Sequence, residues 1–469
     1  MRRSLPWTTR PPPIDSPFPS PPTPRASPRP RASPDHPHPR RSPAPVRKPD
    51  YNRRVVVTGL GVISPVGNDV ATAWSSLVNG VSGLGEITKF DISPYDHRAA
   101  GEVRDFDATA WMDPKAVRRS ERDMHYGVAA AKQAVADSGF EITDQNRADV
   151  GVVFGSGAGG QLLMIESYQT LRDKGPNRVP PTFIANALVD STSGMIAIET
   201  GAIGHNVCIV SACATGTHNV AEAAEVIRRG DCIAVISGST EAPLIEVAHA
   251  GFGNMRGLGS PRPGEPLTTV SRPFDATRNG FVLGEGAGGL FLEDLELAKA
   301  RGARIYAEVV GYGSAADGWD MIQPIEHGTG SARAMKMALD RRGVPADEVD
   351  LINPHGTSTP VGDAREAEAI WTVFGERAAG SRRSLAISAT KSMTGHMMGA
   401  AGAFEAFATV MSVAEQIVPG TLNYRDPDPE CDLWVVDETV RMPVRYALSN
   451  NIGLGGHNGA VIFKRYDGD

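Results

Sequence analysis

The chain has 469 residues, of which 41% are hydrophobic and 22% are charged, and its formal net charge is −7 at pH 7. This length is enough for one large core or two fused cores, and the acidic balance does not favour nonspecific binding to nucleic acid. The 4 cysteines are too few for a disulfide framework and lack the paired spacing of a zinc site, which favours a reducing cytoplasm, and no apolar run reaches the ~18 residues of a membrane span.

Residues 1–50 form a tract rich in proline, arginine and serine that holds nearly half of the 36 prolines in the chain. Such a tract cannot bury enough apolar surface to offset the entropy lost on ordering, so we predict that it is disordered. Its many arginines and few acids also suit an organelle transit peptide, but those peptides form amphipathic helices, which this much proline prevents. We therefore interpret it as a dispensable tail or as sequence upstream of the true start codon.

From Arg54 onward, apolar strands alternate with helices. Strands are predicted at 55–59, 150–154, 232–238, 288–292, 305–311 and 349–353, and helices at 69–79, 120–138, 214–229, 331–342, 363–371 and 399–416. Buried strands separated by helices indicate sheets that are covered on both faces, which is an α/β fold.

A glycine-rich run, Gly155–Gly160, follows the second of these strands. It lacks the Gly-Lys-Ser/Thr ending of a P-loop and the Gly-x-Gly-x-x-Gly opening of a dinucleotide-binding helix. Tight turns and close backbone approach therefore explain it better than a nucleotide site does.

The segment 206–218 passes from an apolar, β-like stretch through Cys213 into a helical pattern. Unpaired N–H groups and the positive end of the helix dipole stabilise a thiolate at a helix N-terminus. We therefore expect the pKa of Cys213 to lie below its ordinary value of about 8.5, which would make it a nucleophile near neutral pH. The competing interpretation is a buried structural cysteine.

Two later segments supply the other residue types that covalent catalysis needs. One, 353–363, places His355 at a strand end, and the other, 388–402, places Lys391 and His396 in a loop that enters an Ala/Gly-rich helix. Each alone is a weak signal, because a strand-end histidine is more often structural than catalytic. In the order Cys, His, Lys, His, however, they resemble the β-ketoacyl-acyl carrier protein synthases, and most closely the elongating enzymes of bacterial type II fatty acid synthesis.

The resemblance extends from about Arg54 to the C-terminus, with further matching segments at 272–288, 308–313 and 450–458. It implies a thiolase-like fold, in which two related α/β halves form a five-layered αβαβα core. The half at 51–300 would contain the nucleophile, and the half at 301–469 the His, Lys and His motifs. It also implies a homodimer that works on substrates carried by acyl carrier protein, without a cofactor or metal and without a nucleic acid or membrane partner.

Residue chemistry then assigns an expected role to each group. The Cys213 thiolate takes the acyl chain from its carrier thioester. Loss of CO2 from malonyl carrier protein leaves an enolate, which neutral imidazoles of His355 and His396 stabilise through N–H hydrogen bonds. The carbanion attacks the acyl carbonyl, whose oxyanion is held by the backbone N–H of Cys213 and, by resemblance, of Leu454. A 3-oxoacyl chain two carbons longer leaves.

Lys391 has two possible roles, because a buried ammonium group can transfer protons or orient its neighbours. Glu405 matches an acidic position of the family, so we expect a Lys391–Glu405 pair that orients the histidine loop rather than proton transfer by Lys391. The resemblance also assigns Asp275 and Glu308 to the support of this loop.

The C-terminal glycine loop departs from the family pattern. Ile452 and Leu454 stand where phenylalanines are usual. In the family, the aromatic residue nearer the glycine pair is a gate that admits the acyl chain after carrier binding. Leu454 therefore either restricts entry of the acyl chain less, or is a substitution that the packing tolerates without a change in function. Chain-length preference therefore stays open, with Met195, Ile196 and Phe252 as pocket candidates from motif position alone.

Other functions fit the pattern less well. A ketosynthase of a specialised polyketide or polyene pathway is the runner-up, because the altered gate is compatible with unusual chains. A non-catalytic partner subunit of the chain-length-factor kind would lack the cysteine. A thiolase would replace one histidine with a second catalytic cysteine, and a cysteine hydrolase would need one histidine with an Asn or Asp partner.

Overall fold

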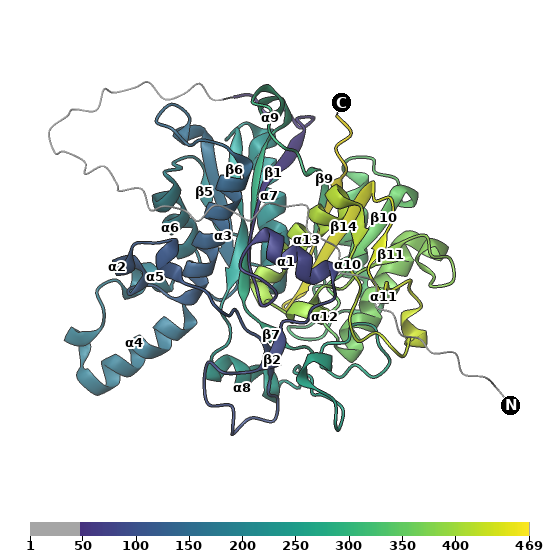
Figure 1. The fold of residues 1–469 in the computed structure, drawn as a ribbon, viewed down its shortest axis with the longest axis horizontal. Helices are drawn as coiled ribbons and strands as arrows, with labels where there is room; N and C mark the ends of the chain where they lie inside the picture. Colours follow the sequence, from purple (N-terminus) through teal and green to yellow (C-terminus); the bar gives the residue numbers. More distant parts are fainter. Residues whose placement is uncertain (1–46, 469) are drawn as a thin grey trace.

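The computed structural model describes residues 47–468. The tail predicted at 1–50 therefore lies outside the described residues, except for its last part at 47–50. Figure 1 shows the first half of the chain, in purple to teal, on the left and the second half, in green to yellow, on the right. None of the helices in the described part of the chain is long and apolar enough to cross a membrane.

One mixed sheet runs through the whole molecule, with 10 strands in the order β11-β10-β14-β15-β9-β1-β8-β6-β4-β5. In chain order these are β1 (Val55–Ile63), β4 (Val150–Ser156), β5 (Asn206–Val207), β6 (Ala234–Glu241), β8 (Gly286–Asp294), β9 (Ala307–Ala316), β10 (Val349–Asn353), β11 (Ala386–Ile387), β14 (Tyr446–Gly453) and β15 (His457–Lys464). Smaller sheets contain β2 (Leu84–Glu86), β3 (Ala99–Gly101) and β7 (Leu283–Gly284), and β12 (Ile417–Val418) with β13 (Val440–Arg441).

The same strand arrangement occurs in each half of this sheet. In the first half, β4 is parallel to β5 and β6, and β8 is antiparallel to both β6 and β1. In the second half, β10 is parallel to β11 and β14, and β15 is antiparallel to both β14 and β9. The halves join where β1 pairs with β9. We propose that the two domains meet at residues 300 and 301, ahead of β9.

Helices form three layers around and between the two halves. On the outside, α3 (Arg122–Ser138) packs on β1, β8 and β6, while α10 (Thr329–Asp340) packs on β9 and β15 beside α11 (Pro360–Phe374). Between the halves, α7 (Thr215–Arg229) and α13 (Ala401–Glu415) contact strands of both (Figure 1). The predicted five-layered αβαβα fold is therefore confirmed.

The remaining helices connect these layers. They are α1 (Val70–Val78), α2 (Pro114–Val117), α4 (Gln161–Lys174), α5 (Phe183–Ala187), α6 (Ser191–Thr200), α8 (Glu246–Asn254), α9 (Leu295–Ala300) and α12 (Lys391–Thr394). Their ends carry ordinary signals: the Asp69 side chain accepts a hydrogen bond from Thr72 N at the start of α1, and Gly230, with φ of 83°, ends α7.

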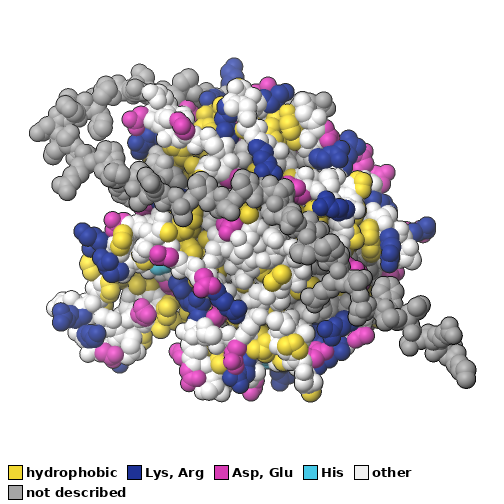
Figure 2. Space-filling view, in the orientation of Figure 1, with side chains coloured by type: hydrophobic (Ala, Val, Ile, Leu, Met, Phe, Trp, Pro, Cys, Tyr) yellow, Lys and Arg dark blue, Asp and Glu magenta, His cyan; other side chains and the backbone are white. Residues whose placement is uncertain are grey.

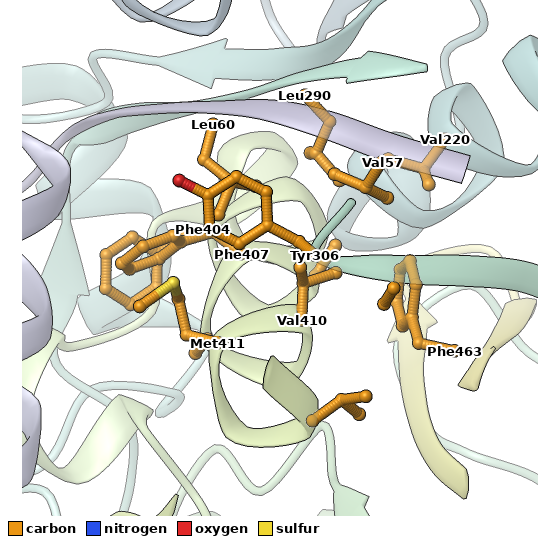
Figure 3. Close-up of a cluster of buried hydrophobic side chains, with 14 of the residues drawn as sticks. Val57, Leu60, Val220, Leu290, Tyr306, Phe404, Phe407, Val410, Met411 and Phe463 are labelled. Carbon is orange, nitrogen blue, oxygen red and sulfur yellow. The ribbon is translucent and has the colours of Figure 1, made fainter. Parts of the chain in front are cut away.

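The helices of the central layer pack mainly apolar side chains against the strands of both halves. Figure 3 shows Phe404, Phe407, Val410 and Met411 of α13 among side chains from β1, β8, β15 and α7. The labelled partners are Val57, Leu60, Leu290, Phe463 and Val220, with Tyr306 nearby. Every residue of α13 from Ala401 to Val413 is buried, so the helix is enclosed on all sides, and this fixes the loop that precedes it.

The β-like stretch predicted before Cys213 is mostly wrong, since only Asn206 and Val207 pair as β5. The side-chain amide of Asn219, on α7, takes the place of a strand partner. It accepts a hydrogen bond from Ile209 N at 3.2 Å and donates one to Ile209 O at 2.8 Å. The backbone is thereby satisfied without a sheet ladder, and the chain can turn sharply at the cysteine.

Candidate active site

Cys213 lies on a single 3₁₀ turn, Ala212–Ala214, directly before α7, and it is 4% exposed. Ala212 has a φ of 51°, a left-handed conformation that a residue with a Cβ adopts only when its surroundings hold it there. A Cβ on Gly216 would lie 2.3 Å from Ala403 N, so α7 and α13 touch backbone to backbone beside the thiol. This contact brings the cysteine to the loop that carries His396.

One cavity of about 350 Å³ brings the predicted groups together, since Cys213, His355 and His396 all line it. His355 follows β10, and Leu454, which also lines the cavity, follows β14. Because β10 and β14 are parallel, their carboxyl ends meet at the same edge of the sheet. The cavity wall is otherwise mainly apolar, with Phe252, Phe281, Met398 and Ile452 among its residues.

The two imidazoles stand edge to face. The ring centroids of His355 and His396 are 5.1 Å apart, and their planes make an angle of 89°. Burial lowers the pKa of both rings well below the ordinary value, and the nearby positive charge of Lys391 lowers it further. Both rings are therefore neutral at physiological pH, which suits N–H donation rather than ion pairing.

The expectation of a lowered pKa for Cys213 is wrong. Burial raises the pKa of this thiol to about 11, although the backbone N–H of Leu454 and the charge of Lys391 both act in the opposite direction. In the free protein the group is therefore a thiol, and the attack on a thioester has to be accompanied by loss of its proton. The helix N-terminus alone does not offset the loss of solvent.

Lys391 and Glu405 form the expected ion pair, with both side chains 2% exposed. Lys391 Nζ donates to Glu405 Oε1, and Asn451 Nδ2 donates to Glu405 Oε2 at 2.6 Å. Asn451 belongs to β14, two residues ahead of the glycine loop that contains Leu454. The pair therefore links the histidine loop, α13 and β14 beneath the cavity.

We expect Glu405→Ala to destabilise the protein by about 3–5 kcal/mol, because it leaves the Lys391 ammonium buried without a counter-charge. Urea unfolding measures this loss. The matched double variant Lys391→Met, Glu405→Leu removes both charges at similar volume, so it should recover a large part of the stability. Equal losses in the single and double variants would contradict the ion-pair explanation.

Two carboxylates that hold the His355 turn are missing from the sequence prediction. Glu366 accepts hydrogen bonds from His355 N at 2.6 Å and Gly356 N at 2.7 Å, and Asp363 accepts from Ser358 N at 3.1 Å. Burial raises the pKa of Glu366 to about 7 and that of Asp363 to about 6. The signal was two acids three residues apart on the helix that begins directly after the His355 motif.

Asp275 and Glu308, which the resemblance assigned to the support of the Lys391 loop, bond to other segments of the chain. Asp275 accepts hydrogen bonds from Arg425 N and Asp426 N, each at 2.9 Å, and therefore holds a different loop. The Glu308 carboxylate pairs with Arg54, at the start of β1. Among the described residues, no hydrogen bond or ion pair joins either carboxylate to the Lys391 loop, so these contacts do not support the expected roles of Asp275 and Glu308.

Of the three residues predicted to line the acyl pocket, one lies at the cavity and two do not. Phe252 lines the cavity. Ile196 is fully buried in a separate core cluster with Phe154 and Val128, and Met195 packs against that cluster, so neither reaches the cavity. Phe252 belongs to α8, which lies at the cavity, whereas Met195 and Ile196 belong to α6, which does not.

Comparison with known proteins gives the same outline. Residues 52–298 match the model of the beta-ketoacyl synthase N-terminal domain, and residues 306–425 match that of the C-terminal domain. The chain belongs to the beta-ketoacyl synthase family. Members of this family are condensing acyltransferases, so the cavity described above is the place to look for condensation chemistry.

Similar ketosynthases come from both fatty acid and polyketide systems. A 3-oxoacyl-acyl-carrier-protein synthase 2 from Staphylococcus aureus strain N315 is 44% identical over 417 residues, which cover 89% of this chain and 99% of the relative. The solved ishigamide ketosynthase/chain length factor is 35% identical, with a TM-score of 0.80, and covers 88% of this chain and 99% of its own. A type II polyketide ketosynthase, solved with its acyl-carrier protein and bound to a hexaketide, is 31% identical, with a TM-score of 0.80, over 90% of this chain and 100% of its own.

Proposed function

We propose that this ketosynthase is a 3-oxoacyl-acyl-carrier-protein synthase of fatty acid synthesis. It condenses malonyl carrier protein, with loss of CO2, onto an acyl chain held by Cys213. The observation that carries the proposal is the convergence of one thiol and two neutral imidazoles, from His355 and His396, on a single cavity. That set supplies a covalent acyl carrier and two N–H donors for an enolate, which are the needs of decarboxylative condensation.

Cys213 acts first as the nucleophile. Its Sγ attacks the thioester carbonyl, the carrier thiol leaves, and the thiol proton passes to the departing sulfur or to a neighbouring neutral imidazole. The backbone N–H groups of Cys213 and Leu454 both lie close enough to the sulfur to lower its pKa. They are therefore suitably placed to hold the oxyanion formed at the carbonyl attached to that sulfur.

His355 and His396 act in the second half-reaction. Their neutral rings donate N–H hydrogen bonds to the malonyl thioester oxygen, so negative charge can develop there as CO2 departs. The carbanion then attacks the acyl carbonyl on Cys213, the Cys213–acyl bond breaks, and the 3-oxoacyl chain leaves on the carrier. Lys391, paired with Glu405, keeps the His396 loop in position and lowers the pKa of both rings.

The substrates arrive on the phosphopantetheine arm of acyl carrier protein, and no other cofactor takes part. The complex of the polyketide relative with its carrier protein supports this partner. Arg256 lines the cavity, is exposed and makes no ion pair among the described residues. Its guanidinium is therefore available to the phosphate of the arm or to an acidic side chain of the carrier.

The protein acts as a homodimer in the cytoplasm. α4, α5 and α6 project from the first half of the chain, away from the second half (Figure 1), and β5 is an edge strand of the main sheet. These helices expose large apolar side chains, namely Met164, Ile165, Tyr168, Leu171, Ile184 and Ile198. On the face in Figure 2, positive and negative side chains are intermixed. Several exposed large apolar side chains on neighbouring helices are typical of a protein interface.

The test is reconstitution with purified acyl and malonyl carrier proteins. Mass spectrometry should show an acyl adduct on Cys213, followed by a 3-oxoacyl carrier product after malonyl carrier protein is added. A series of saturated and unsaturated acyl chains would measure chain preference. Absence of both the adduct and the product with every acyl chain would contradict the proposal.

A polyketide ketosynthase is the second candidate, because Leu454 lines the cavity as an aliphatic residue. A branched aliphatic side chain occupies less area than an aromatic ring and admits bulkier or stiffer chains. Efficient acylation by polyenoyl or 3-oxoacyl thioesters, with poor acylation by saturated chains, would favour this candidate over fatty acid elongation.

A further inference from the structure

The glycine run after β4 wraps around a carboxylate of the protein itself. Glu241 lies at the end of β6, and its side chain accepts hydrogen bonds from Gly157 N at 2.8 Å, Ala158 N at 3.2 Å and Ser156 Oγ at 2.8 Å. Successive backbone N–H groups in such a loop form a nest that binds anions. In this protein the nest is filled by Glu241, which explains a phosphate-loop-like sequence without a phosphate.

A fourth donor connects this nest to the active site. Gly399 N donates to Glu241 Oε2 at 3.1 Å. Gly399 belongs to the 3₁₀ turn Met398–Ala400, and Met398 in that turn has a left-handed φ of 48°. The turn lies directly after His396 and Met397. One carboxylate therefore joins the glycine loop to the segment that presents a catalytic imidazole.

The backbone at Gly399 packs tightly against Glu241 and the glycine loop. A Cβ on Gly399 would lie 2.5 Å from Glu241 Oε2 and 2.5 Å from Gly157 N. On the other side of the segment, His396 N donates to Val282 O at 2.7 Å. The backbone around His396 is thus held from two directions, and Glu241 provides one of them.

Among the described residues, no hydrogen bond or ion pair joins Glu241 to Cys213, His355 or His396. It is 2% exposed and is not among the residues that line the cavity. We infer that Glu241 is a positioning residue, whose carboxylate holds residues 396–399 against the glycine loop and thereby sets the place of the His396 imidazole during decarboxylation. This inference rests on the proposed function.

The decisive variant is Glu241→Gln, which keeps the shape but turns one acceptor oxygen into an NH2 group that faces N–H donors. We expect decarboxylation of malonyl carrier protein to fall about 10- to 100-fold, the effect of a misplaced catalytic group. Acylation of Cys213, measured separately by mass spectrometry, should not fall by more than about threefold, because Glu241 holds no part of the Cys213 turn.

A second readout depends on charge alone. Among the groups that face Glu241 are Asp123, Cys208 and Cys213, and the negative charge of Glu241 raises the pKa of the Cys213 thiol. Burial raises the pKa of Glu241 to about 7, so its carboxylate is fully charged only above that pH. There, removing the charge should increase the thiolate fraction, and iodoacetamide should alkylate Cys213 faster in Glu241→Gln. A role limited to general stability would not produce this increase.

The matched control is Glu293→Gln. Glu293 is also a fully buried glutamate, and it accepts a hydrogen bond from Thr58 Oγ1 at the opposite end of the same strand pair. It pairs with Ala234, while Glu241 pairs with Gly286, so the two acids are about 23 Å apart along the strands at ~3.3 Å per residue. This variant should lose thermal stability while both half-reactions and the alkylation rate stay near wild type.

The outcomes separate the two proposals. If wild-type protein fails in both half-reactions, the proposed function is wrong, whatever Glu241 does. If wild type performs both, then normal decarboxylation by Glu241→Gln overturns the inference. An equal loss of decarboxylation in Glu241→Gln and Glu293→Gln overturns it as well, because the effect would then follow from stability rather than position.

Discussion

Replacing Cys213 with alanine should abolish condensation, with a loss of about 10⁴-fold or more, because no other group in the cavity can carry the acyl chain covalently. The measurements are mass spectrometry of the acylated protein and detection of the 3-oxoacyl carrier product. Fold and thermal stability should change little, since a small buried thiol is replaced by a methyl group.

Cys208→Ala is the matched control for this result. Cys208 lies on the same segment, five residues earlier, and is half-buried with its Sγ 3.4 Å from Val189 O. It does not line the cavity, so the variant should condense at a rate near that of wild type. Normal condensation by Cys213→Ala, or its loss in Cys208→Ala alone, would show that the nucleophile has been assigned to the wrong residue.

Replacing His355 or His396 with alanine should impair decarboxylation of malonyl carrier protein but not acylation of Cys213. Decarboxylation of malonyl carrier protein should fall about 10²–10³-fold in each variant, which is the usual effect of losing one donor to a developing oxyanion. Acylation of Cys213 should persist, because the backbone N–H groups that hold the thioester oxyanion remain. Single-turnover assays with acyl and malonyl carrier proteins, run separately, measure each step.

A half-buried histidine outside the cavity provides the comparison. His125, on α3, bonds through its ring to Ser120 Oγ and Val117 O, and it is not among the cavity residues. His125→Ala should leave both half-reactions unchanged apart from a stability loss. If acylation and decarboxylation fell together in the His355 and His396 variants, the assignment of both rings to the enolate would be untenable.

Local patterns in the sequence predict the proposed catalytic groups, because each lies where a strand or loop gives way to a helix. The small-residue turn at Cys213, the strand end at His355 and the Ala/Gly-rich approach to α13 are all visible over a few residues. Glu366 lies only 11 residues after His355, on the helix that follows its motif. Glu241 and Asn451 are harder to predict, since they act on segments far away along the chain. Resemblance selected Asp275 and Glu308 instead, which hold other loops.

Sequence alone was sufficient for the α/β class and for the family, and it proposed the residue types of a covalent condensing site, because these depend on periodicity and on short motifs. Only the tertiary structure decided the protonation of those groups. Closure of α13 and the 453–456 loop over Cys213 raises the pKa of its thiol, and the same burial keeps both histidines neutral. Desolvation depends on every segment that packs around a group, so no local pattern contains it.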